Sequence, residues 1–126
     1  MFELLAVGVG GFLGAIARYG LSGLVHRHYD GAFPLGTLAV NVLGCFAIGA
    51  LMTLVEDRQV LSPGTRLFLM IGLLGSMTTF STLGHETFEL LRDSALRLAL
   101  WNIAGNVLLG IAAVGLGRAT VKLFGA

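Results

Sequence analysis

Long uncharged stretches, separated by short polar segments, make up most of the amino-acid sequence. The first, near the amino terminus, is interrupted only by Arg18, Tyr19 and Ser22. A bilayer core ~30 Å thick is spanned by about 20 apolar helical residues, and these runs lack the alternation of barrel strands. The pattern predicts an all-α membrane protein with four transmembrane helices, near residues 4–25, 35–55, 67–91 and 98–121.

Short connections join the four predicted helices: His26–Gly31, Glu56–Gly64 and Arg92–Ser94. Ser62 followed by Pro63 is typical of an N-cap and a first helical position. The spans fill almost the whole chain, so residues 1–126 form one transmembrane domain. The amino terminus has no basic region and no cleavage site, which indicates a permanent span rather than a signal peptide. We expect a multi-pass protein of the cell (inner) membrane.

Composition narrows the function classes. Only 12 % of the residues are charged and 56 % are hydrophobic, whereas soluble domains average about 25 % charged residues. This excludes a soluble enzyme and a disordered chain. A net charge of +1 gives no positive electrostatic field that would attract a polyanion, so a nucleic-acid binder is excluded. The single cysteine, Cys45, excludes a disulfide scaffold.

Basic residues are divided almost evenly between the two sides of the predicted bundle. The side of both termini holds Arg58, Arg66, Arg118 and Lys122, and the other holds Arg27, Arg92 and Arg97, with Arg18 deeper. Orientation normally follows an excess of basic residues on the cytoplasmic side. Two interpretations stay open: a weak bias that still sets one orientation, or insertion both ways up followed by pairing as an antiparallel homodimer.

Glycine is unusually frequent, with 19 in 126 residues against a usual ~7 %. The glycines form small-xxx-small patterns, among them Gly10/Gly14 and Gly11/Ala15, and cluster again around Gly110 and at Gly115 and Gly117. Such faces let membrane helices approach closely. They serve either a partner subunit, since four helices enclose little interior, or packing within one subunit.

Amide side chains lie inside two of the spans. Thr37 and Asn41 are four residues apart and share one face of the second predicted helix, as do Asn102 and Asn106 in the fourth. Amides facing lipid would be costly, so these must face protein or water. They form either interhelical hydrogen bonds or the lining of a polar path.

Five hydroxyl residues lie within positions 76–82 of the third span, after Gly72 and Gly75. One or two hydroxyls can bond back to the preceding turn, but five indicate an interrupted helix. Unwound backbone at membrane depth is tolerated inside protein or a wet cavity, where its carbonyls can hold a cation.

The buried polar groups are mainly hydrogen-bond donors. Arg18 either extends to the membrane surface or gives a wet vestibule positive potential. No carboxylate lies in the middle of a span, and Glu86 and Glu89 lie towards the end of the third. A donor-rich lining suits a small anion. The histidines have no second ligand at helical spacing, and no nucleophile motif is present, so we expect no enzyme.

Three segments together resemble the CrcB/Fluc fluoride channel family. They are GGFLGAIARY at 10–19, GTLAVN at 36–41 and GSMTTFST at 75–82. Their order, their spacing and the chain length all agree with the family, and the match covers nearly the whole chain.

The resemblance implies antiparallel, dual-topology homodimers of four-helix subunits with two pores that pass fluoride passively out of the cytoplasm. It also implies a structural, non-transported Na⁺ held by the backbone carbonyls of Gly75 and Thr78. The family's pore asparagine matches Asn41, and its vestibule arginine matches Arg18. The implied pore line further includes Thr37, Phe80, Ser81, Thr82, Asn102 and Asn106, the last two where the family commonly has tyrosine or serine.

One position departs from the family pattern. The second pore phenylalanine is replaced by Leu83, which lacks the positive ring edge that can contact an anion. Two alternatives to a passive fluoride channel remain. One is a small dual-topology transporter of the drug-exporter type, which would want a mid-membrane glutamate. The other is a non-conducting structural subunit of the membrane.

Overall fold

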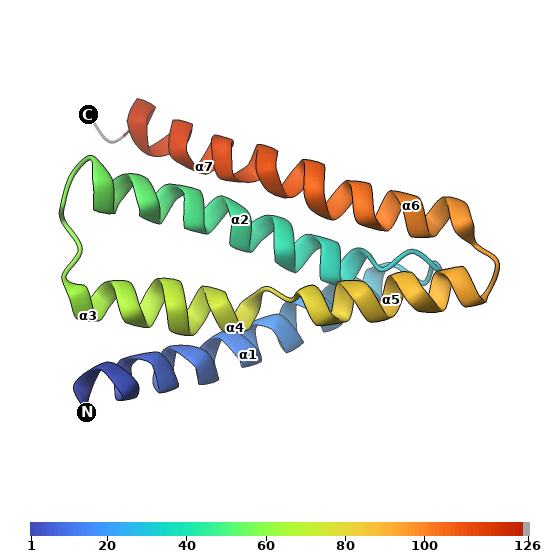
Figure 1. Ribbon diagram of the computed structural model, residues 1–126, viewed down its shortest axis with the longest axis horizontal. Helices are drawn as coiled ribbons and strands as arrows, with labels where there is room; N and C mark the ends of the chain where they lie inside the picture. The colour runs from blue at the N-terminus through green and yellow to red at the C-terminus, as the bar shows by residue number, and fades with distance from the viewer. Residues whose placement is uncertain (125–126) are drawn as a thin grey trace.

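The computed structural model describes residues 1–124, and these residues form a bundle of helices. Four helical spans are long and apolar enough to cross a membrane: Phe2–His28, Leu35–Glu56, Pro63–Arg92 and Leu96–Phe124. Figure 1 shows that both termini and the connection between the second and third spans lie at one end of the bundle. The four predicted helices and their alternating direction are thus confirmed, while the pairing of two subunits stays a prediction.

The spans differ in their regularity. The first two are single helices, α1 (Phe2–His28) and α2 (Leu35–Glu56). The third consists of α3 (Pro63–Arg66), the π-helix η1 (Leu67–Leu74), α4 (Gly75–Met77) and, after a break, α5 (Phe80–Arg92). The fourth consists of α6 (Leu96–Ala104), the π-helix η2 (Gly105–Leu109) and α7 (Gly110–Phe124).

The break in the third span confirms the predicted interruption. Thr78 and Thr79 leave the helical region, with φ/ψ of −78°/155° and −151°/121°. The predicted N-cap is also confirmed, because the Ser62 side chain accepts a hydrogen bond from the Thr65 amide at 3.2 Å. The π segments were not predicted, since no residue type selects the i→i+5 pattern and packing decides where it occurs.

The first connection begins later in the chain than the sequence indicates. The prediction that a loop begins at His26 is wrong, because α1 continues to His28. The Nδ1 atoms of His26 and His28 lie 2.8 Å and 2.9 Å from the carbonyl oxygens of Ser22 and Leu24. Each of these side-chain bonds runs from the last turns of α1 back to a carbonyl four residues earlier.

Glycines bring α1 against the first half of the third span. A Cβ atom on Gly10 would lie 2.3 Å from the Phe68 carbonyl oxygen, and one on Gly14 would lie 2.1 Å from that of Leu73. No larger residue fits at this separation. The Gly10/Gly14 pattern is therefore used for packing within one subunit.

Close backbone contact at glycines also joins α2 to α7, which run side by side in Figure 1. A Cβ atom on Gly49 would lie 2.2 Å from the Val114 carbonyl oxygen, and one on Gly117 would lie 2.1 Å from that of Phe46. A Cβ atom on Gly115, two residues away on α7, would meet nothing within 4 Å. The two helices thus cross with their backbones nearly in contact.

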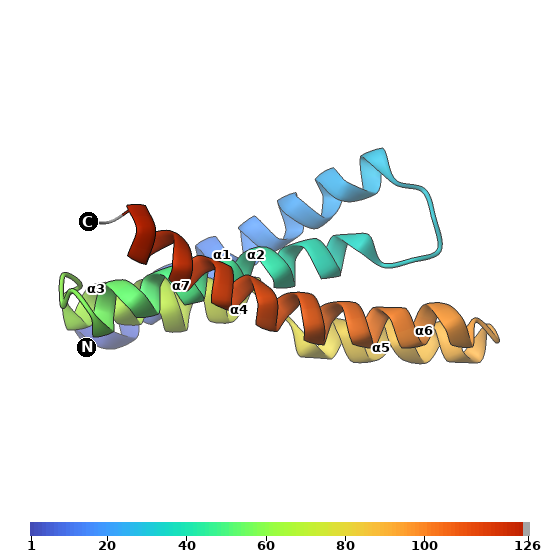
Figure 2. The ribbon, with the colours of Figure 1, turned by 90° about the horizontal axis from the view of Figure 1, so that it is seen from above.

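The buried apolar core is small and central. It is a cluster of Val40, Leu74 and Met77, where α2 meets the third span just before the break. Most large apolar side chains elsewhere are exposed, as lipid-facing residues of a single subunit would be. Figure 2 shows the second half of α1 diverging from the pair formed by α5 and α6.

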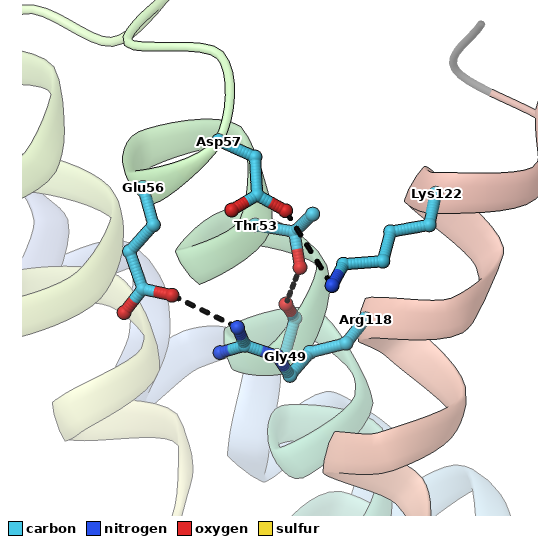
Figure 3. A network of polar contacts seen from close by, with 6 residues as sticks. All are labelled: Gly49, Thr53, Glu56, Asp57, Arg118 and Lys122. Atoms are coloured by element: carbon cyan, nitrogen blue, oxygen red, sulfur yellow. Dashed lines mark hydrogen bonds and ion pairs between the residues drawn. The ribbon is translucent and has the colours of Figure 1, made fainter.

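Ion pairs join α2 and α7 at the end that carries the termini (Figure 3). Arg118 Nη2 lies 2.9 Å from Glu56 Oε2, and Lys122 Nζ lies 3.7 Å from Asp57 Oδ2. Nearby, Thr53 donates a hydrogen bond to a carbonyl one turn earlier. Exposed pairs of this kind contribute about 0–1 kcal/mol each. Acidic residues have little effect on membrane orientation. The pairing of Arg118 and Lys122 with Glu56 and Asp57 therefore does not change the argument from the near-even division of basic residues.

The α2–α7 crossing gives a matched pair of substitutions. We expect Gly117→Ala to destabilise the protein by about 1–3 kcal/mol, the range for overpacking, because its methyl group would overlap the Phe46 carbonyl. Gly115→Ala makes the same change on the same helix with free space around it and should not destabilise. Thermal unfolding in detergent, with the yield of monodisperse protein, measures both. Equal losses for the two variants would contradict the close crossing.

Candidate functional site at the break in the third span

The backbone at the break is paired with a side chain of α2. The Thr79 amide donates to Asn41 Oδ1 at 2.9 Å, and Asn41 Nδ2 donates to the Thr79 carbonyl at 3.2 Å. One carboxamide therefore satisfies both polar groups of a residue that has left the helix. Unsatisfied peptide groups at membrane depth would cost several kcal/mol, so Asn41 makes the break possible.

The helix after the break begins with a side-chain cap. The Thr79 hydroxyl oxygen accepts a hydrogen bond from the Thr82 amide at 3.2 Å, as N-cap residues do. The same hydroxyl lies 3.1 Å from Thr82 Oγ1 and 3.2 Å from Ser81 Oγ. Three of the predicted hydroxyls thus gather at the start of α5.

These contacts release two carbonyl oxygens before the break. In a continuous helix the amides of Thr79 and Thr82 would donate to the carbonyls of Gly75 and Thr78. Here they donate to Asn41 and to the Thr79 side chain instead. The Thr78 hydroxyl bonds back to a carbonyl one turn earlier. Both residues predicted to offer backbone oxygens therefore lose the amide partners that a continuous helix would give them.

The asparagines of the fourth span meet Asn41 inside the bundle. Asn41 Nδ2 donates to Asn106 Oδ1 at 2.8 Å, and Asn106 Nδ2 donates to both the Asn102 carbonyl and Asn102 Oδ1. Asn102 Nδ2 donates to the Thr87 hydroxyl at 3.0 Å. Interhelical hydrogen bonds, one of the two alternatives that the sequence left open, are therefore present among these residues.

An open groove of about 620 Å³ lies along the break and the start of α5. Its lining combines polar groups of the break, including Asn41, Thr79 and Asn106, with apolar side chains. Phe80 and Leu83 both line it, but Phe80 is 85 % exposed and Leu83 only 8 %. The phenylalanine ring therefore extends from the subunit surface, whereas the leucine that departs from the family pattern lies in the interior.

Thr37 lies one turn before Asn41 and contacts a carboxylate. Its hydroxyl donates to Glu86 Oε1 at 2.6 Å. The other carboxylate oxygen, Oε2, is buried without a hydrogen-bond partner within residues 1–124. The sequence alone did not assign Glu86 a role, because nothing in its spacing shows that it faces Thr37 across two helices.

Arg18 lies apart from the break. It lines a separate hollow of about 800 Å³ on α1, together with Tyr19, Ser22, His26 and Arg27. The structure thus brings Asn41, Phe80, Ser81, Thr82 and the two asparagines of the fourth span to one region, with Thr37 one turn away, and leaves Arg18 outside it. Thr87 is a member of the polar network that the sequence did not indicate.

Comparison with known proteins agrees with this architecture. Residues 5–118 match the family model described as CrcB-like protein, Camphor Resistance (CrcB). The chain is 48 % identical over 118 residues to the fluoride-specific ion channel FluC 1 of Methanosarcina acetivorans, covering 94 % of this chain and 89 % of the relative. It is 44 % identical over 124 residues to FluC of Nitratidesulfovibrio vulgaris, covering 98 % and 99 %.

These matches extend over all four apolar spans and the break. Together with the four long apolar helices, they make this a multi-pass membrane protein. The chain belongs to the CrcB family.

Proposed function

We propose that this protein is a fluoride-selective passive ion channel that exports fluoride and lowers its cytoplasmic concentration. The observation that carries the proposal is the near full-length similarity to relatives named fluoride-specific ion channels, in a chain whose third span is broken among clustered hydroxyl and amide groups. The function is ion conduction rather than catalysis.

The chemistry of the break suits a small, strongly hydrated anion. A pore must replace the hydrogen bonds that water gives to the ion, and it must hold the ion weakly enough to release it. Hydroxyl groups, amide groups and the positive edge of an aromatic ring meet both needs. The proposed fluoride path runs from the groove at Asn41 and Phe80 to the hydroxyls of Ser81 and Thr82 at the start of α5, with Thr37 one turn along α2.

The other proposed pore residues stand at different depths. Arg18, in its hollow on α1, would give positive potential to the aqueous vestibule. Asn102 and Asn106 lie behind Asn41, where both N–H groups of Asn106 already have acceptors. We therefore propose that Asn102 and Asn106 contribute to the pore from the interior of the subunit, behind Asn41.

A dual-topology, antiparallel homodimer completes the proposal. The groove at the break is open, and the Phe80 ring is 85 % exposed although the fluoride path needs it enclosed. The near-even division of basic residues permits insertion both ways up. A second subunit would cover the groove and supply the wall that one chain lacks.

A structural Na⁺ is proposed at the break. The carbonyl oxygens of Gly75 and Thr78 fit this role, because the amides that would satisfy them donate elsewhere. Within residues 1–124, no group of three His, Cys, Asp or Glu side chains could hold a metal ion, so the ligands would be backbone oxygens. Hard cations prefer such oxygen ligands, and the bound ion would supply positive charge that the chain itself does not place there.

Fluoride efflux from proteoliposomes tests the function. We expect fast passive efflux of fluoride and little of chloride. Phe80→Ile should slow fluoride efflux about tenfold, the effect of losing an aromatic contact worth ~1.4 kcal/mol. Because the ring is exposed in the subunit, this substitution should leave no cavity within the chain, and the thermal stability of the subunit should change little.

Leu83→Phe is the companion variant, since it restores the family's second phenylalanine. We expect fluoride efflux to rise or to stay unchanged. A normally assembled Leu83→Phe protein that loses efflux, or a Phe80→Ile protein that keeps it, would contradict the proposed pore line. Absence of fluoride efflux from the unaltered protein would favour a non-conducting structural subunit.

The Na⁺ proposal predicts unequal effects of two substitutions. Thr78→Ala removes only a side chain and should reduce efflux less than Gly75→Leu, which adds a bulky, helix-favouring residue beside the proposed ligands. Efflux of the unaltered protein should fall when a large organic cation replaces Na⁺ on both sides. Equal efflux with and without Na⁺ would count against the site.

The topology proposal is tested by labelling a cysteine at Gln59→Cys, in the exposed connection between α2 and α3, with a membrane-impermeant thiol reagent. We expect labelling from both sides of the cell membrane, and we expect added arginines at one end of the bundle to bias it to one side. The unaltered protein controls for Cys45. Labelling of Gln59→Cys from one side alone would rule out dual topology.

A further inference from the structure

A line of hydrogen bonds connects the break to a residue of α5 two turns later. In every bond of this line, each residue donates to the next one. The Thr79 amide donates to Asn41 Oδ1 at 2.9 Å, and Asn41 Nδ2 donates to Asn106 Oδ1 at 2.8 Å. Asn106 Nδ2 donates to Asn102 Oδ1 at 3.1 Å, and Asn102 Nδ2 donates to Thr87 Oγ1 at 3.0 Å. We call these five residues the amide chain.

The direction of the amide chain is set by one backbone group. The oxygen and nitrogen of an asparagine side chain can in general be exchanged by a flip, but a backbone N–H can only donate. The Thr79 amide therefore requires the oxygen of Asn41, and Asn41 in turn directs its nitrogen at Asn106. The same requirement passes to Asn102. Flipping Asn41 or Asn106 breaks bonds on both sides of that residue. Flipping Asn102 breaks its bond with Asn106, whereas the Thr87 hydroxyl can donate as well as accept.

The interior of the amide chain is closed to solvent. Asn102 is 0 % exposed, and Thr87 and Asn106 are 8 % and 9 % exposed. The second N–H of Asn106 donates to the Asn102 carbonyl at 2.9 Å, so neither N–H of Asn106 is free for an anion. Of the three bonds made by the Asn41 carboxamide, the one from Nδ2 to the Thr79 carbonyl is the longest, at 3.2 Å.

We propose that Asn106 and Asn102 are positioning residues and that Thr87 is the anchor of the amide chain. This inference rests on the proposed fluoride channel. The two asparagines fix the orientation of the Asn41 carboxamide, and Asn41 fixes the peptide at the break. Aligned hydrogen bonds in a low-dielectric interior polarise one another, so a change at Thr87 is transmitted to Asn41 on a different helix.

The chain has only three asparagines, all in the amide chain, and one glutamine, Gln59, in an exposed loop. Uniformly ¹⁵N-labelled protein therefore gives four side-chain carboxamide signals, one of them a control. We expect Thr87→Val, which keeps the shape of the side chain and removes the hydroxyl, to shift the signals of all three asparagines and to leave Gln59 unchanged. Thr87→Ser keeps the hydroxyl and should restore the Asn41 signal.

Fluoride efflux gives the functional arm of the same experiment. Thr87→Val should slow efflux about tenfold, as expected for the loss of one buried hydrogen bond, and Thr87→Ser should conduct like the unaltered protein. A shift confined to Asn102, an Asn41 shift of equal size in both variants, or unchanged efflux in Thr87→Val would overturn the proposal. If the unaltered protein shows no efflux, the proposed function fails, while the carboxamide signals still test the amide chain.

A measurement on the unaltered protein covers the case in which Thr87→Val does not fold. Both side-chain N–H groups of Asn106 are bonded and buried, so we expect them to exchange with solvent deuterium far more slowly than those of Gln59. The Thr79 backbone amide should also be protected, although it lies outside any helix. Exchange at Asn106 as fast as at Gln59 would overturn the amide chain.

Discussion

The pairing of the Asn41 carboxamide with the peptide groups of Thr79 is the contact on which the rest of the site depends. A break in a transmembrane helix exposes backbone donors and acceptors where no water is present to satisfy them. Asn41 takes both groups of Thr79 at 2.9 Å and 3.2 Å. Because it does so from α2, the second span holds the third in its broken form, and the start of α5 is placed beside the groove.

The same pairing has consequences on both sides of the break. Before it, the carbonyls of Gly75 and Thr78 lose their helical amides. After it, Thr79 caps α5 and gathers the hydroxyls of Ser81 and Thr82 at one point. The irregular backbone at Thr78 and Thr79 thus lies between carbonyl oxygens that suit a cation and hydrogen-bond donors that suit an anion. This separation is the physical basis of the proposed channel.

Close helix crossings give that site a rigid frame. Gly10 and Gly14 place α1 against η1, and Gly49 and Gly117 place α2 against α7, each with less room than a methyl group needs. Few apolar side chains are buried in the subunit, so backbone contact and buried polar bonds provide much of its internal packing, as in many membrane helix bundles. The Phe80 ring and the groove at the break remain exposed on the surface of the subunit.

The four spans, the break and the polar residues around it could be predicted from the amino-acid sequence, because uncharged length and clustered hydroxyls are local properties of the chain. The sequence left open whether Asn41, Asn102 and Asn106 bond to one another or face a path, since spacing along one helix does not show what another helix brings. The packing of the folded chain was needed to show that Asn41 bonds to Thr79 and Asn106, that Thr37 bonds to Glu86, and that Asn102 bonds to Thr87. Each of these contacts joins different helices, and their geometry is set by glycine crossings and π segments that depend on packing.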